Sequence, residues 1–278
     1  MLKKIQFMMV CVLAAVLFFV ISNKTISTNW TQNEQSSSQT VEENNSKGEQ
    51  ASTEEIIDKE DVEEPIADED TGNIVYLTFD DGPNSASAEI LDILDQFNAK
   101  ATFFMLEPAM RTYPDIVNRI AEDGHAVALH GVTHDKNKFY QSEQSALDEM
   151  KTNQETLENI TGVRSYLIRT PYGSIPYLTD SFREVLDNNG FTLWDWNIDS
   201  DDWSLAGGDY VQNVISQIEQ LDDGETPVVL MHDKSETANH LSKLLSYLQE
   251  HGYQTKIIEE HTEPYYFKCH ERCYRLGN

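Results

Sequence analysis

From Asn73 onward, short apolar runs rich in β-branched and aromatic residues alternate with segments of helical periodicity. The expected strands are 74–79, 101–106, 126–130, 165–169, 191–198, 226–232 and 253–258, and the expected helices are 86–97, 114–122, 143–160, 178–188, 210–221 and 238–250. This alternation requires crossover connections and therefore a mostly parallel sheet. The pattern predicts an α/β fold for residues 73–278, a distorted (β/α) barrel with about seven parallel strands.

Ionisable residues recur where these expected strands end. They are the pair Asp80–Asp81, His130, Arg169, the pair Asp195 and Asp199, and His232. The carboxyl ends of parallel strands meet at one face of a barrel, which is the face that carries the chemistry in such folds. Solvation alone does not explain ionisable groups on five successive units, so these residues predict one functional site.

The stretch H-G-V-T-H (130–134) suggests metal ligands. Its spacing resembles the zinc helix of metalloproteases, but Gly131 stands where that helix needs a glutamate, and Gly-Val-Thr is a poor helix former. We therefore expect a strand end that turns into a loop. Taken alone, two histidines at this spacing are more often surface residues. Together with Asp81, however, His130 and His134 would form an open three-ligand site for a divalent ion.

Five motifs in a fixed order resemble one known family. They are T-F-D-D-G-P (78–83), H-G-V-T-H (130–134), R-T-P-Y-G (169–173), D-S-D-D-W (199–203) and L-M-H (230–232). The chain resembles the polysaccharide deacetylases, the NodB-homology domain of carbohydrate esterase family 4, over residues 73–258. One departure is Gly131, where the family usually has a serine or threonine that supports the metal loop. Its absence puts the rigidity of that loop in doubt, but not the ligand set.

The resemblance implies a role for each residue of the site. Asp81, His130 and His134 would hold one divalent metal ion, zinc first, with cobalt, nickel or iron as alternatives. Asp80 would be the general base, with Arg169 as its ion-pair partner. His232 would be the general acid, oriented by Asp199. The Tyr172 N–H would donate to the oxyanion, and Trp203 and Leu230 would form the wall around the acetyl methyl.

The resemblance also implies a reaction: metal-dependent hydrolysis of N-acetyl groups on a sugar polymer, with release of acetate. Peptidoglycan, deacetylated at N-acetylglucosamine, is the expected substrate, and chitin-type oligomers or a poly-N-acetylglucosamine exopolysaccharide are alternatives. An O-acetyl esterase that acts on xylan is the main alternative chemistry. A non-catalytic glycan-binding module is a further alternative, although the intact set of Asp80, the metal ligands and His232 argues against it.

The first 72 residues predict an extracytoplasmic protein. Ile5–Ile21 is apolar apart from Gln6 and follows two lysines, which is typical of a signal-anchor, favoured here, or a signal peptide over residues 1–22. Residues 23–72 carry 14 acidic and three basic residues and few large apolar ones, which predicts a disordered acidic linker. We expect a membrane-anchored or secreted, cell-wall-associated monomer. The net charge of −28 argues against a nucleic-acid partner.

Two cysteines lie close together near the C-terminus, at Cys269 and Cys273. Outside the cell, a short-range disulfide is the first interpretation. Two unpaired thiols are the second, and a metal site that includes His270 is a weaker third, because no other cluster of ligands accompanies it.

Overall fold

The computed structural model describes residues 73–277, and the statements below on structure refer to that range. The predicted membrane or signal segment (1–22) and the predicted linker (23–72) lie outside it. None of the helices between residues 73 and 277 has the length and apolar character that a membrane crossing requires.

Eight strands in the described part of the chain form one sheet, and every strand pair is parallel. The strands are β1 (Asn73–Asp80), β2 (Thr102–Met105), β3 (Ala126–Leu129), β4 (Leu167–Ile168), β5 (Thr192–Leu193), β6 (Ile198–Asp199), β7 (Val228–His232) and β8 (Tyr253–Lys256). Their order is β5-β4-β3-β2-β1-β7-β6, and β8 pairs with the first half of β1. The predicted α/β class and parallel pairing are confirmed.

The expected strand 191–198 is wrong as a single element. Its beginning is β5, which pairs with β4 at one edge of the sheet, and its end leads into β6, which pairs with β7 at the other edge. Between them the ladder is interrupted, and the Asp195 N–H donates instead to the carbonyl of Tyr265, 2.8 Å away. The sheet is therefore a curled half-barrel whose hydrogen-bonded path is open between β5 and β6, rather than a continuous barrel.

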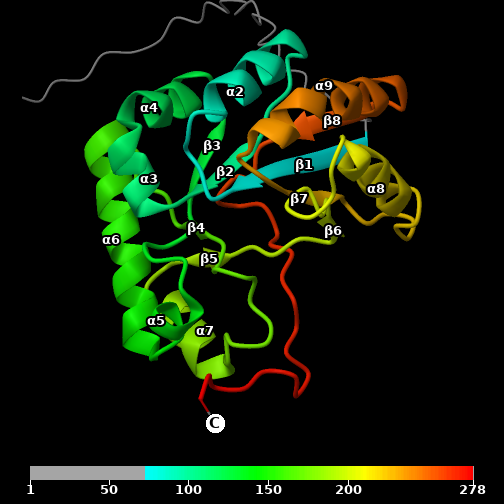
Figure 1. The fold of residues 1–278 in the computed structure, drawn as a ribbon. Coiled ribbons are helices and arrows are strands. Elements are labelled where there is room, and N and C mark those ends of the chain that lie inside the picture. The colour runs from blue at the N-terminus through cyan, green and yellow to red at the C-terminus, as the bar shows by residue number, and fades with distance from the viewer. Residues whose placement is uncertain (1–72, 278) are drawn as a thin grey trace, which may run out of the picture. The chain divides into compact units, whose positions relative to one another are not determined.

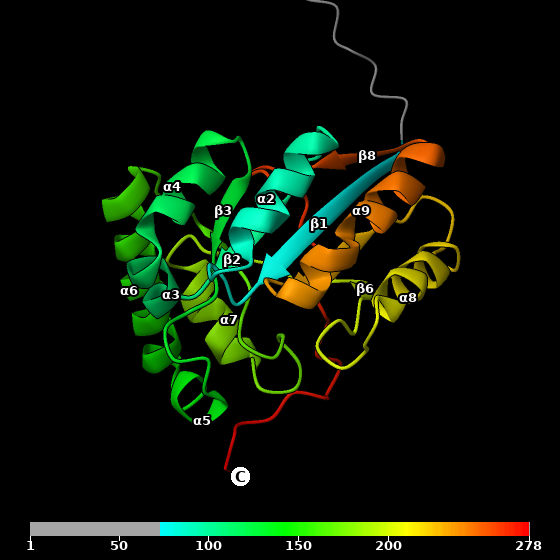
Figure 2. The same cartoon turned by 45° about the horizontal axis from the view of Figure 1, so that its top comes forward.

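The helices pack around the outside of this curl (Figure 1). They are α2 (Ser87–Gln96), α3 (Glu107–Thr112), α4 (Pro114–Glu122), α5 (Lys136–Phe139), α6 (Glu143–Thr161), α7 (Asp180–Asp187), α8 (Asp209–Ile218) and α9 (Ser235–Glu250). The sequence predicts all of them except the short α3 and α5. Figure 2 shows β1 running beside α2 and α9. The long α6 begins at a capping box on Ser142 and ends at Gly162, whose φ of 75° only glycine adopts without strain.

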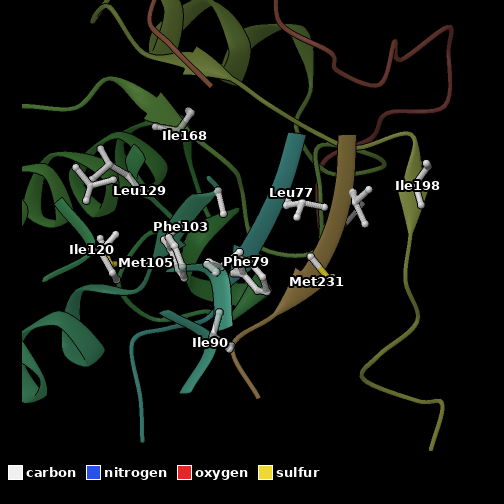
Figure 3. Packing of buried hydrophobic residues seen from close by; sticks show 14 of the residues in the cluster. Leu77, Phe79, Ile90, Phe103, Met105, Ile120, Leu129, Ile168, Ile198 and Met231 are labelled. Carbon is white, nitrogen blue, oxygen red and sulfur yellow. The ribbon is translucent and has the colours of Figure 1, made fainter. Parts of the chain in front are cut away.

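Alternation along each strand divides the core into two parts. Leu77, Phe79, Phe103 and Met231 point outward and pack under the helices, together with residues such as Ile90 of α2 (Figure 3). The alternate residues face into the curl. There a smaller cluster forms from Phe104, Ala128, Leu167, Trp194, Val228 and Ile258. This alternation decides which side chains reach the site, because the inward series of β1, β3, β4 and β7 ends in or leads directly to a polar residue.

A C-terminal segment (residues 259–277) follows β8 and packs against the domain. The Phe267 N–H donates to the carboxylate of Asp195 at 2.7 Å, and Arg183 of α7 donates to the Phe267 carbonyl at 3.0 Å. Cys269 and Cys273 form a disulfide within this segment, as the first interpretation of the sequence expects. The C-terminal segment is therefore hydrogen-bonded to the rest of the domain.

Candidate metal centre and active site

Strand register brings the ionisable residues together. Asp80, the last residue of β1, is the register partner of His232, the last residue of β7. On the other side, Leu129 pairs with Ile168, so the residues that follow them, His130 and Arg169, leave adjacent strands at the same level. All four functional side chains continue the inward series of their strands, two residues after Thr78, Leu230, Ala128 and Leu167 respectively. The predicted clustering at the carboxyl ends of the strands is therefore present.

The neighbouring acids Asp80 and Asp81 diverge. Asp80 is buried, and its Oδ1 accepts a hydrogen bond of 2.8 Å from the Arg169 guanidinium. The backbone of Asp81 has a φ of 72°, in the left-handed region, and this turn carries its carboxylate away from Arg169. Asp81 Oδ1 instead lies 3.5 Å from Nε2 of His130 and 3.4 Å from Nε2 of His134. Each acid thus has its own partner.

Arg169 is fully buried and has several acceptors. Besides Asp80, it donates to the Thr78 hydroxyl at 2.7 Å, the Trp194 carbonyl at 3.2 Å and the Asp195 carbonyl at 2.9 Å. Its guanidinium carbon also lies 4.2 Å from the centre of the Phe104 ring. A buried cation with a carboxylate partner and a full set of acceptors is held in one geometry. Arg169 can therefore hold the Asp80 carboxylate in one orientation.

Asp81, His130 and His134 form a three-ligand cluster. One ligand atom from each lies within 4.8 Å of the others, and Asp81 Oδ1 is buried with no hydrogen-bond partner among the described residues. The Arg169 carbonyl lies 2.8 Å from Nδ1 of His130; because a carbonyl can only accept, Nδ1 carries the proton and Nε2 offers its lone pair to the cluster. Burial, followed by the neighbouring His130, lowers the pKa of His134, which favours the neutral form that metal ligation needs. These residues fit a divalent ion.

His232 faces this cluster from β7 and is held by Asp202. The Nδ1 of His232 lies 2.7 Å from Asp202 Oδ1, and the His232 backbone N–H donates to Asp202 Oδ2 at 2.8 Å. The Thr237 hydroxyl also donates to Asp202 Oδ2 at 2.5 Å. The carboxylate therefore fixes both the ring and the backbone of His232.

The two pKa values of this pair shift in opposite directions. Burial by itself would lower the pKa of His232, but the hydrogen bond and charge of Asp202, with the charges of Asp80 and Asp81, leave that pKa raised. Burial would raise the pKa of Asp202, but its hydrogen bonds and the charge of His232 leave it lowered. The arrangement favours an imidazolium paired with a carboxylate, and such an imidazolium can donate a proton from Nε2.

Of the three further predicted residues, Tyr172 directly contacts the cluster, through His134. Tyr172 is 55 % exposed; its ring lies 4.6 Å from that of His134, and its hydroxyl donates to the His134 carbonyl at 3.0 Å. Leu230 is buried on β7 and faces the same side as His232. Trp203 is 60 % exposed and directly follows Asp202. An apolar floor with two exposed aromatic rings is a suitable surface for a sugar.

Comparison with known proteins agrees with this geometry. A family model described as polysaccharide deacetylase matches residues 67–194. A Bacillus subtilis protein provisionally named as a polysaccharide deacetylase, YheN, is 45% identical over 193 residues, which cover 68% of each protein. The peptidoglycan-N-acetylglucosamine deacetylase of Bacillus cereus is 37% identical over 195 residues, 67% of this chain and 70% of that protein. The chain belongs to the polysaccharide deacetylase family, the family 4 carbohydrate esterases.

A solved structure supports the assignment. The crystal structure of the polysaccharide deacetylase Bc1974 from Bacillus cereus superposes with a TM-score of 0.66 at 35% identity, covering 72% of this chain and 98% of that one. The family model ends at residue 194. In this polysaccharide deacetylase, the placement of Asp202 and His232 therefore rests on the geometry described above.

The structure corrects one residue of the predicted deacetylase site. Asp199 is the residue expected from the sequence to orient His232. The carboxylate that is hydrogen-bonded to His232, however, is that of Asp202. Asp199 lies on β6, where its Oδ1 accepts from the Asp201 N–H at 3.0 Å, and burial raises its pKa. Both acids belong to D-S-D-D-W, and the motif alone does not indicate which of them faces β7.

Asp195 has a structural role that the sequence does not indicate. This carboxylate is fully buried and accepts from the Ser174 N–H at 2.9 Å, the Ser174 hydroxyl at 2.6 Å and the Phe267 N–H at 2.7 Å. It therefore joins the turn that carries Tyr172 to the C-terminal segment of the deacetylase. Its position at the end of an expected strand marked it as a candidate, but the structure gives it a positioning role.

Proposed function

We propose that this polysaccharide deacetylase hydrolyses N-acetyl groups from N-acetylglucosamine residues of peptidoglycan and releases acetate. The observation that carries the proposal is the placement of three groups at one edge of the sheet. They are the Asp81–His130–His134 cluster, the Asp80–Arg169 ion pair and the His232–Asp202 pair. An amide hydrolase needs an activated water, a proton acceptor and a proton donor, and these groups can supply each of them.

Asp80 is the proposed general base. Its Oδ1 is engaged by Arg169, while its Oδ2 lies 3.8 Å from Nε2 of His130, on the side of the ligand cluster. A carboxylate with one oxygen anchored and the other turned toward the cluster can take a proton from a water held there. Asp81, His130 and His134 would hold the ion, zinc being the best match to two imidazoles and one carboxylate. When bound, the metal would lower the pKa of a coordinated water and polarise the acetyl carbonyl.

His232 is the proposed general acid. With Nδ1 directed at Asp202, the imidazolium carries its second proton on Nε2 and can deliver it to the departing sugar amine. The Tyr172 backbone N–H is the proposed donor to the oxyanion, and Leu230 and Trp203 are proposed to contact the acetyl group and the sugar. His232 and Asp80 end neighbouring strands, so acid and base would approach one amide from two sides.

The choice of polymer rests on two supports. The Bacillus cereus relative that is 37% identical bears the name peptidoglycan-N-acetylglucosamine deacetylase. The apolar segment at residues 5–21 and the acidic stretch that follows would place the catalytic domain outside the cytoplasm, near a membrane and within reach of the cell wall. We accordingly propose a membrane-anchored or secreted, wall-associated enzyme.

Mass spectrometry of glycan fragments tests the substrate. Peptidoglycan, N-acetylglucosamine oligomers and acetylxylan are each incubated with the purified full chain and with its Asp80→Asn variant. We expect the wild-type protein to remove one acetyl mass from each modified N-acetylglucosamine, and the variant to remove none. Acetate release from acetylxylan alone would contradict the proposal in favour of an O-acetyl esterase. Glycan binding with no acetate release from any substrate would favour a binding module.

Metal removal tests the cofactor. Dialysis against a chelator should abolish acetate release, and added Zn²⁺ should restore it, because one ligand atom from each of the three side chains lies within 4.8 Å of the others and Asp81 Oδ1 has no hydrogen-bond partner among the described residues. Co²⁺, Ni²⁺ and Fe²⁺ are the comparison ions. Full activity in the metal-free protein, verified by elemental analysis, would exclude a metal-dependent mechanism.

A further inference from the structure

The loop between the two histidine ligands belongs to no helix or strand. Residues 131–133 connect His130, at the end of β3, to His134, and both Gly131 (φ 88°) and His134 (φ 44°) have left-handed backbone. Neither a helix nor a strand therefore fixes the distance between the two imidazoles. Because ligand atoms must stay within a few tenths of an ångström of their coordinating positions, another part of the molecule has to hold this loop.

Glu149 of α6 contacts the loop with both carboxylate oxygens. Its Oε2 accepts from the N–H groups of Val132 and Thr133, each at 2.9 Å, and its Oε1 accepts from the Thr133 hydroxyl at 2.7 Å. The two oxygens of a carboxylate offer about four acceptor sites, so one side chain can accept all three hydrogen bonds at once. Three of them on two consecutive residues leave the middle of the loop little freedom to rotate.

Asn153, one turn further along α6, holds the start of the same loop. It is fully buried, and its Nδ2 donates to the Gly131 carbonyl at 2.6 Å and to the Met105 carbonyl at 2.8 Å. The loop is thereby tied to the end of β2 as well as to α6. Helical spacing of four residues puts Glu149 and Asn153 on one face of the helix, so one rigid element presents both contacts.

Gly131 fits this arrangement. A Cβ at this position would lie 3.2 Å from Oε2 of Glu149 and 3.4 Å from the Phe139 ring, on a backbone that already favours glycine. The missing side chain lets the helix carboxylate approach the loop backbone. Glu149 is not one of the clustered ligands, and both of its oxygens are already engaged by the loop.

We propose that Glu149 is a positioning residue for the metal centre: through Val132 and Thr133 it holds His134 at the distance from His130 and Asp81 that a divalent ion requires. The inference rests on the metal-dependent function proposed above. Glu149 is expected to affect metal affinity and not the chemical step. Its carboxylate contacts only backbone N–H groups and a hydroxyl of the loop, none of which reacts.

Zinc affinity of the full chain, measured by competition with a chromophoric chelator, tests this assignment. Glu149→Ala should weaken Zn²⁺ binding by about 10- to 100-fold, the usual effect of losing a group that orients a ligand. Glu149→Gln should stay close to wild type, because the amide oxygen can accept both N–H groups and the amide nitrogen can donate to Thr133. Glu155→Ala, an exposed glutamate on the same helix, is the matched control and should leave the affinity unchanged.

The outcomes distinguish the positioning role of Glu149 from the metal-dependent function of the protein. Wild-type zinc affinity in Glu149→Ala would overturn the positioning role and leave the proposed function intact. Equal losses in the Ala and Gln variants would also overturn it, because charge and not hydrogen bonding would then be responsible. Failure of the wild-type chain to bind zinc would instead overturn the metal-dependent function. If Glu149→Ala does not fold, Thr133→Val, which removes one of the three hydrogen bonds, should still weaken zinc binding measurably.

Turnover at saturating zinc provides a second measurement. Because Glu149 does not touch the reacting atoms, the kcat of Glu149→Ala should recover to within a few-fold of wild type once the site is filled. A kcat that stays low at full zinc occupancy would contradict a role confined to metal affinity.

Discussion

Two carboxylates that share one site repel each other, yet Asp80 and Asp81 are directly linked in sequence. The separation comes from one backbone angle, the φ of 72° at Asp81. It leaves Asp80 facing the guanidinium of Arg169 and turns Asp81 toward two imidazoles. With an extended backbone at position 81, the two carboxylates would no longer face separate partners. The turn after β1 is therefore as necessary to the site as the two acids.

Asp80→Asn tests the proposed base. The amide oxygen can still accept from Arg169, and Arg169 keeps its bonds to Thr78 and to two backbone carbonyls, so the domain should fold. Loss of the proton acceptor should lower kcat by about 10²–10⁴-fold. Turnover of N-acetylglucosamine oligomers and far-ultraviolet circular dichroism measure the two effects. A folded variant with near-normal turnover would remove Asp80 from the mechanism.

The correction from Asp199 to Asp202 leads to a prediction on pH dependence. His232, the proposed acid, must be protonated to act, and Asp202 raises its pKa, so activity should persist to higher pH and fall as pH rises through that raised value. Asp202→Asn removes the charge, so the alkaline limb of the kcat/KM profile should move to lower pH and kcat should fall. Asp199→Asn should leave that limb nearly unchanged. A larger shift from Asp199→Asn would restore the original assignment.

The residues of the site differ in how far the sequence can predict them. The ends of the apolar runs mark Asp80, His130, Arg169 and His232, because the carboxyl ends of parallel strands meet at one face of the sheet. Asp202 lies in an irregular loop after β6, where only the folded path decides which of the nearby acids reaches His232. Gly131 is a similar case: it lacks the hydroxyl common at this position, but a helix carboxylate distant in sequence contacts the loop instead.

At the level of the elements, the long helices are predicted to within a few residues, since caps such as Ser142 and Gly162 act locally. The segment 191–198 shows where local patterning fails. Its residues have strand-like composition throughout, but β5 and β6 pair with partners at opposite edges of the sheet. The break at Asp195 depends on the C-terminal segment, which supplies the Tyr265 carbonyl from 70 positions further along the chain.

The C-terminal segment is expected to contribute to stability through Asp195. Asp195→Ala would leave the buried Ser174 N–H and the half-buried Phe267 N–H without this acceptor, at a cost of about 1–3 kcal/mol for the buried donor and less for the other. The free energy of unfolding, measured with urea, should fall accordingly, and turnover should fall because the turn bearing Tyr172 loosens. Asp222→Ala, at an exposed position, should change stability by no more than about 0.5 kcal/mol. Equal stabilities for the two variants would refute the role of Asp195.

For the whole molecule, the net charge of −28 has a consequence for the product. Deacetylation converts a neutral acetamide into an amine that carries positive charge, and an acidic protein attracts such a polymer. We expect the full chain to bind glucosamine oligomers more tightly than N-acetylglucosamine oligomers at about 0.01 M salt. The difference should vanish near about 1 M, where the Debye length is only about 3 Å. Binding that does not depend on salt would show that the charge acts on solubility alone.

The pairing of β1 with β7 sets the time at which activity can first arise during synthesis. The Thr78 hydroxyl donates to the Val229 carbonyl across a separation of 151 residues. At about 5–20 residues per second, roughly 8–30 seconds pass between the appearance of the first strand and that of its partner. Asp81, His130 and His134 all precede that moment, whereas His232 ends the late strand. A nascent chain can therefore present all three proposed metal ligands before it has either the β1–β7 strand pair or His232, the proposed proton donor.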